Sequence, residues 1–166
     1  AMVPFFGQGM NSGFEDCTIL SSLIDDSKPN SEAEWHSLLD KYTQVRKPAG
    51  DAILDLALHN YIVMRDKTGD PEYLIQKRIE ARISAAHPDR WKPLYTLVTF
   101  SHIPYADAWS RGEIQQAVMN KIMASPDISK NWENDEIVAQ AIKLLDAFES
   151  GTDTIDRPVP LLSTDV

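Results

Sequence analysis

The sequence has almost no cysteine and no long apolar run, and these two absences exclude several classes of protein. Cys17 is the only cysteine among 166 residues, so an internal disulfide and a zinc cluster built from cysteines are both excluded. No segment reaches the roughly 18 consecutive apolar residues that predict a membrane-spanning helix. A lone cysteine also fits a reducing compartment. We therefore expect a soluble, cytoplasmic protein.

Basic charge is also scarce. The chain carries 16 Lys and Arg residues against 25 Asp and Glu residues, for a net charge of -9. Binding to a phosphate backbone needs a basic surface that displaces condensed counterions, so we expect no nucleic-acid partner. Hydrophobic residues make up 43% of the chain. At this length they are enough for one core, and we expect one globular unit.

Residue patterns typical of metal sites and acid/base pairs are missing as well. The histidines are widely spaced and form no i, i+4 pair, so we predict no metal site; they are His36, His59, His87 and His102. Glu15 and Asp16 are adjacent, and adjacent helical side chains point in different directions. We therefore assign this pair to helix stabilisation. No Ser or Thr has a visible base and orienting group, so no catalytic side chain is assigned.

Hydrophobic periodicity predicts six helices, over residues 11–26, 31–47, 51–64, 71–87, 106–124 and 135–148. Ser31 and Glu34 form a capping-box pair at the start of the second. Lys47-Pro48 predicts its end, and Asp51 is a suitable cap for the third. Pro71 suits the first position of the fourth helix. Gly151 suits a left-handed cap after the last.

Residues 94–100 have a different pattern. The run Leu-Tyr-Thr-Leu-Val-Thr-Phe is rich in β-branched and aromatic residues and lies between Pro93 and Pro104. It predicts one short β segment, whose partner strands would have to lie elsewhere because buried ladder groups need partners. The predicted fold class is therefore mainly α, with about six helices and one short β segment. The tail from residue 153 to 166 is expected to be loose.

The most informative motif is Pro-Phe-Phe-Gly-Gln-Gly-Met-Asn at residues 4–11, which precedes the first predicted helix. Glycines at 7, 9 and 13 would let the backbone approach a ligand closely. The amides at a helix start favour partial negative charge. On spacing alone, a plain turn with a helix cap explains such a loop at least as well.

The full string resembles the flavin-contacting segment of the FAD-dependent aromatic-ring hydroxylases, most closely of the members that act on L-kynurenine. Residues 60–65, Asn-Tyr-Ile-Val-Met-Arg, and residues 93–101, Pro-Leu-Tyr-Thr-Leu-Val-Thr-Phe-Ser, match the same family in order. The resemblance covers residues 2 to 110. It implies that residues 1–26 end an FAD-binding domain. It also implies that residues 27–152 form a C-terminal helical region on the substrate side, followed by the tail.

The resemblance also implies particular contacts. It places Gly9, Met10 and Asn11 at the flavin and Pro4 and Phe5 beside the substrate ring. Asn60 and Tyr95 match family positions that bind the amino-acid end of L-kynurenine. On its sequence context alone, Asn60 is better explained as bonding a neighbouring backbone group, and Tyr95 as part of the core with its hydroxyl at the rim.

The implied activity is that of an oxidoreductase of tryptophan degradation and NAD biosynthesis. This flavoprotein monooxygenase would use NADPH and O2 to convert L-kynurenine to 3-hydroxykynurenine. No Gly-x-Gly-x-x-Gly follows a predicted strand, so we expect a C-terminal portion that neither retains FAD nor turns over alone.

Two alternatives stay open: a free-standing helical interaction module, and a related flavin hydroxylase with another aromatic substrate. Self-association through the surface that the remaining domain would cover is a further expectation.

Overall fold

Helices form all the regular secondary structure in residues 2–154, the part of the chain that the computed structural model describes. They are α1 Gly9–Ser27, α2 Glu32–Asp66, α3 Pro71–Ala86, α4 Leu94–Phe100, α5 Tyr105–Met123, α6 Ile128–Asn131 and α7 Asp135–Glu149. The predicted mainly α fold class is confirmed. The expected loose tail lies outside the described residues from 155 onward. No helix in residues 2–154 is long and apolar enough to cross a membrane.

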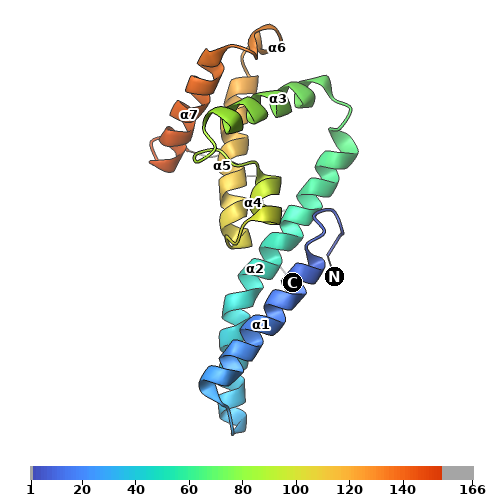
Figure 1. The fold of residues 1–166 in the computed structure, drawn as a ribbon, viewed down its shortest axis with the longest axis vertical. Helices are drawn as coiled ribbons and strands as arrows, with labels where there is room; N and C mark the ends of the chain where they lie inside the picture. The colour runs from blue at the N-terminus through green and yellow to red at the C-terminus, as the bar shows by residue number, and fades with distance from the viewer. Residues whose placement is uncertain (1, 155–166) are drawn as a thin grey trace.

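The long helix α2 joins the two ends of the molecule (Figure 1). Helix α1 runs antiparallel along the first half of α2, and α3, α5 and α7 pack together at the other end. Helix α4 packs against α5, on the side that faces α2. The loop before α1 lies beside the middle of α2. The N-terminal motif therefore lies near the residues of α2 around Asn60, which follow it by about 55 positions in the sequence.

Helix α2 corrects one prediction, because the second and third predicted helices are a single helix. Its start is as predicted: the Ser31 side chain accepts from the Glu34 amide, and Glu34 accepts in return from the Ser31 amide. Pro48 lies inside the helix, and Asp51 pairs with Lys47 instead of capping. An interior proline costs about 3 kcal/mol, and apolar burial on both sides of it offsets this cost.

Helix α4 corrects a second prediction, because residues 94–100 are helical and not extended. Leu94, Leu97 and Val98 have the i, i+3, i+4 spacing of one helical face, and the last two are buried. The Leu97 amide donates to the Pro93 carbonyl at 3.0 Å. Since no strand is present in residues 2–154 to pair with this segment, only a helix satisfies its backbone groups locally.

The remaining boundaries agree with the sequence to within a few residues. Asp70 accepts from the Glu72 amide at 2.9 Å, and Pro71 is at the first position of α3. Gly151 has a φ of 71°, as predicted for a left-handed residue after α7. The short helix α6 had no counterpart in the prediction.

Two apolar clusters form the core. The larger one joins α3, α5, α6 and α7 and consists of Ile79, Ile83, Trp91, Val118, Met119, Ile122, Ile128, Val138, Ala141, Leu145 and Phe148. The smaller one joins the N-terminal loop to α2, α4 and α5 through Phe6, Ile53, Leu56, Leu97, Val98 and Ala108. The N-terminal motif therefore contributes directly to a core through Phe6.

Candidate functional site

The N-terminal loop is held between α2 and α4 by one hydrogen bond and two ring contacts. Asn60 Nδ2 donates to the Phe5 carbonyl at 2.6 Å. The Phe5 ring lies 4.7 Å from the Tyr61 ring, and the Phe6 ring stacks on Tyr95 at 5.6 Å between centroids. The structure thus joins Asn60 to Phe5 directly and brings Tyr95 to the same loop through Phe6, although these residues are far apart in sequence.

A tight turn gives this loop its shape. The Gly7 amide donates to the Pro4 carbonyl at 3.3 Å, and Gly7 has a φ of 67°, a region that favours glycine. The turn leaves Pro4 exposed at the surface while Phe6 is buried. Pro4 is therefore on the open side of the loop, next to Phe5.

The structure shows how Asn60 is used within the chain itself. Its Nδ2 bonds a backbone carbonyl, as the alternative interpretation predicted, but the acceptor is 55 residues away and belongs to the motif. Among residues 2–154, no protein group donates to Asn60 Oδ1. Asn60 consequently fixes the loop with one end of its amide and leaves the other end open to an additional partner.

Tyr95 is not a core residue. Its exposed fraction is 53%, and its ring lies between Phe6 and the exposed Phe100, whose centroid is 6.4 Å away. Its hydroxyl has no hydrogen-bond partner in the described residues. The expectation that Tyr95 packs in the core is therefore wrong, and its ring forms part of an exposed aromatic surface.

The start of α1 holds the three residues that the resemblance predicts at the flavin, Gly9, Met10 and Asn11. Gln8 precedes the helix without a side-chain cap, and the first intrahelical amide bond runs from Ser12 to the Gln8 carbonyl at 2.9 Å. Asn11 Nδ2 donates to Gln8 Oε1 at 2.9 Å, and Met10 is 69% exposed. The amides of residues 9–11 precede this first bond and are available to an external acceptor. A Cβ added at Gly9 would meet only ordinary contacts with Met2.

Glu15 and Asp16 do not act as the sequence predicted. Both contact the buried guanidinium of Arg46: Nε donates to Asp16 Oδ1 at 2.6 Å, and Nη1 lies 3.0 Å from Glu15 Oε2. The first turn of α1 contains no acidic residue, so dipole compensation is not their role. Burial opposes the charge of Arg46, but the two carboxylates outweigh it and raise the pKa of Arg46. No local pattern signals this contact, because Arg46 lies 30 residues further along the chain.

Two more titratable groups lie at the contact of α2 and α5. The His59 ring packs edge-on against Trp109, with centroids 5.7 Å apart. Burial, followed by the charges of Lys67 and Lys77, lowers the pKa of His59. Burial, followed by the charge of Glu15, raises the pKa of Tyr105. Both environments favour the neutral form, which is consistent with packing roles.

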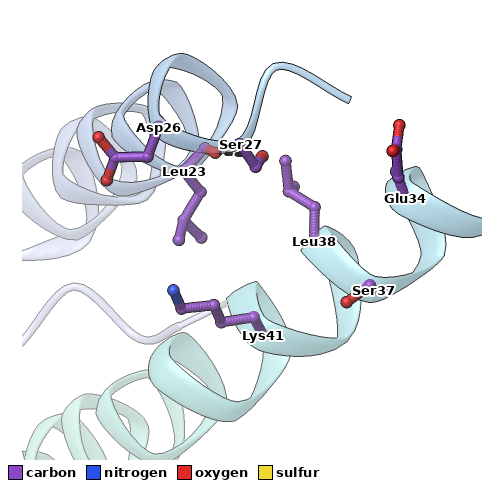
Figure 2. Close-up of a pocket in the computed structure, with 7 residues that line it drawn as sticks. All are labelled: Leu23, Asp26, Ser27, Glu34, Ser37, Leu38 and Lys41. Carbon is purple, nitrogen blue, oxygen red and sulfur yellow. Dashed lines mark hydrogen bonds between the residues drawn. The ribbon is translucent and has the colours of Figure 1, made fainter. Parts of the chain in front are cut away.

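The two clearest surface hollows lie away from the predicted contacts. One, of about 380 Å³, lies between the end of α1 and the start of α2, with Leu23 of α1 and Leu38 of α2 on either side of it (Figure 2). The other, of about 210 Å³, lies near Arg90 and Arg111. None of the predicted substrate or cofactor residues lines either hollow. Of the predicted site residues, Pro4, Met10 and Tyr95 are exposed at the surface around the loop.

The loop, Asn60 and Tyr95 belong to the segments through which the sequence resembles the FAD-dependent aromatic-ring hydroxylases, and the structure places the loop beside both residues. Within that class the chain is similar to kynurenine 3-monooxygenase. The enzyme of Christiangramia forsetii is 41% identical over 146 residues, which cover 87% of this chain and 32% of that protein. The enzyme of Myxococcus xanthus is 40% identical over 122 residues, covering 74% of this chain and 25% of that protein.

A more divergent relative, from Stenotrophomonas maltophilia, is 36% identical over 149 residues, or 90% of this chain and 32% of that protein. No protein-family model matches the chain. The chain spans about a third of the length of these curated relatives. The resemblance to kynurenine 3-monooxygenase is confirmed, and the partial coverage is consistent with its C-terminal portion.

Proposed function

We propose that this chain is the substrate-side, C-terminal part of a flavoprotein monooxygenase that converts L-kynurenine to 3-hydroxykynurenine with NADPH and O2. The observation that carries the proposal is the convergence of the loop at residues 4–8 on Asn60 and Tyr95. In this proposal residues 1–26 complete the FAD-binding domain and residues 27–152 form the substrate side. The exposed lone Cys17 is in keeping with action in the cytoplasm.

The surface around the loop suits an aromatic amino acid. Phe5 and Tyr61 offer ring faces against which the substrate ring can stack, with Pro4 at the edge. Asn60 Oδ1 is free to accept from an ammonium group, and the Tyr95 hydroxyl is free to donate to a carboxylate. These groups bind and orient the substrate. No acid or base from this chain takes part.

The start of α1 fits the edge of a flavin. The open amides of residues 9–11, with no side-chain cap at Gln8, provide donors for a carbonyl or anionic acceptor. Bound FAD, reduced by NADPH, supplies the oxygen-transfer chemistry. Gly9, Met10 and Asn11 would hold the flavin and shield it from water, and the open amides would stabilise negative charge on it.

Two alternatives have a specific observation in their favour. Val3, Met10, Phe14 and Phe100 are exposed apolar side chains, and such side chains favour an interaction module or self-association. The contacts around Tyr61 would equally accept another aromatic substrate, as in a related flavin hydroxylase. Elution volume in gel filtration and the response to L-kynurenine separate these cases.

The first test uses the purified chain incubated with FAD and passed over gel filtration. Our proposal expects a colourless protein that retains no flavin, because the sequence contains no Gly-x-Gly-x-x-Gly motif for the ADP part. The second test uses the chain joined to its FAD- and NADPH-binding portion. There Asn60→Ala and Tyr95→Phe should raise the Michaelis constant for L-kynurenine about tenfold, as expected for lost polar contacts, and change turnover less.

Matched controls keep this second test specific. Asn120→Ala and Tyr73→Phe make the same chemical changes on α5 and α3, away from the loop, and should leave the Michaelis constant unchanged. Equal kinetics in the site variants and the controls would contradict the proposed substrate contacts. A complete enzyme that oxidises NADPH with a different aromatic compound, but not with L-kynurenine, would favour the related hydroxylase.

A further inference from the structure

Arg46 links α1 to α2 through ion pairs in which the arginine is far more buried than in a usual surface ion pair. The Arg46 side chain is only 7% exposed, and its guanidinium reaches two neighbouring carboxylates at 2.6 and 3.0 Å. Glu15 and Asp16 themselves are about half exposed. A buried arginine that donates a hydrogen bond to one carboxylate and forms an ion pair with a second holds a fixed orientation, because its fork is planar and its position is set by packing.

This tie adds to a weak apolar contact, because the apolar residues of α1 that are not exposed, Ile19, Leu20, Leu23 and Ile24, are only half-buried. The only buried residue of α1 is Ser12. Glu15 and Asp16 lie one to two helical turns beyond Gly9–Asn11, the residues proposed to contact the flavin. At the other end of the loop, Asn60 of α2 bonds the Phe5 carbonyl. The loop and the first turn of α1 are therefore fastened at two points on α2.

We propose that Arg46 is a positioning residue that fixes the flavin-contacting end of α1 relative to the substrate-contacting Asn60 of α2. The assignment of those two contacts rests on the proposed function; the mechanical coupling does not. Arg46 and Asn60 are 14 residues apart on one helix, or about 21 Å at 1.5 Å per residue. This distance excludes direct contact, so an effect of Arg46 on Asn60 passes either through α1 and the loop or along α2 itself. Glu15→Gln and Asp16→Asn leave α2 unchanged and therefore isolate the first route, which we propose.

The chain offers a matched control for this coupling. Arg90 also bridges two carboxylates of one helix, Asp146 at 2.6 Å and Glu149 at 2.9 Å on α7. Its removal changes the same kind of interaction in the C-terminal bundle, away from the loop. Arg46→Ala leaves behind only half-exposed carboxylates that water can solvate, so the variant should still fold.

The experiment records the side-chain amide signals of Asn60 by NMR in the 166-residue chain, together with hydrogen exchange at the Ser12 amide. In Arg46→Ala we expect the Asn60 signals to shift towards those of a free amide and exchange at Ser12 to quicken by about tenfold or more. Arg46→Lys, which keeps the charge but not the fork, should be intermediate. Arg90→Ala should leave both readouts unchanged.

Unchanged Asn60 signals in Arg46→Ala would overturn the proposal. So would equal effects of Arg46→Ala and Arg90→Ala, which would show a general loss of stability. Should Arg46→Ala not fold, Arg46→Lys and the separate variants Glu15→Gln and Asp16→Asn give the same test. Neither readout needs FAD or L-kynurenine. A negative result in these measurements therefore does not contradict the proposed function. A failure to bind flavin or substrate, in turn, does not contradict the coupling between Arg46 and Asn60.

Discussion

The C-terminal bundle and the N-terminal region of this chain are held together in different ways. In the bundle, α3, α5, α6 and α7 share a continuous apolar cluster around the fully buried Trp91. In the N-terminal region, α1 contributes no apolar residue to either buried cluster, and its apolar residues are at most half-buried. The polar ties to Arg46 and the anchoring of Phe6 therefore carry more of its attachment. Stability is therefore concentrated in one region, and the candidate site lies in the other. Changes near the site can alter geometry without unfolding the chain.

The largest expected effect tests the bundle side of this contrast. Trp91 is 1% exposed, and Trp91→Ala should lower the free energy of unfolding by about 3–5 kcal/mol, the usual cost of truncating a large buried aromatic side chain. Urea denaturation followed by far-UV circular dichroism measures this loss. Phe6→Ala, in the smaller cluster beside the solvent, should cost less.

A conservative variant at the same position sharpens the result. The Trp91 Nε1 is buried without a hydrogen-bond partner among residues 2–154. Trp91→Phe removes this unpaired donor, so its cost should stay well below that of Trp91→Ala. Trp91→Phe leaves a smaller cavity than Trp91→Ala. Equal losses in the free energy of unfolding would therefore rule out cavity formation as the main cause.

The same glycine-to-alanine substitution in α2 and in α5 compares an uncrowded helix position with a tightly packed one. Gly50 lies inside α2 with nothing within 4 Å of an added Cβ, whereas a Cβ at Gly112 of α5 would lie 2.9 Å from Leu94 Cδ2. Gly50→Ala should stabilise the chain by about 0.5–1 kcal/mol through helix propensity. At Gly112 the crowding of α4 should cancel that gain. Thermal denaturation of both variants tests the difference, and equal melting shifts would contradict it.

The smallest expected effect concerns pH and the contact between the two regions. Burial lowers the pKa of His59 below its ordinary value of 6.5. As pH falls below 6.5, the unfolded chain takes up a proton before the folded one does, so the free energy of unfolding should decrease. Above 6.5 this contribution is fully present.

Urea midpoints at pH 7.5 and 5.5 measure the change. His59→Gln should make the midpoint less dependent on pH, whereas the exposed His36→Gln serves as a control and should not. A pH dependence that survives in His59→Gln would assign the titration to other groups.

Local patterns predicted much of the fold because they report local energies. The capping box at Ser31, the proline at the start of α3 and the glycine after α7 each act within one helical turn. The errors arose where distant contacts decided the structure. Pro48 is tolerated because α2 is packed on both sides of it, and residues 94–100 are helical because Leu97 and Val98 face a core formed elsewhere.

The candidate site shows the same division. The motif and the family resemblance predicted Phe5, Asn60 and Tyr95 as substrate contacts, and the structure links Asn60 to Phe5 and Tyr95 to the neighbouring Phe6. The sequence did not predict the role of Tyr61, although Tyr61 lies in the segment 60–65 that resembles the family. It also did not predict the role of Arg46. Arg46 has no local signal, since its partners lie 30 residues earlier. Only the antiparallel packing of α1 on α2 brings them within hydrogen-bond distance.

The position of Cys17 has a practical consequence for any study of assembly. It is the only cysteine, it is exposed on α1, and it directly follows Asp16 of the Arg46 contact. Two chains that meet through α1 in air can form an intermolecular disulfide, which mimics a specific dimer on a sizing column. A thiol reductant, or Cys17→Ser, separates the two origins. The same thiol also accepts a spectroscopic label without any change to the sequence, next to the contact whose geometry is in question.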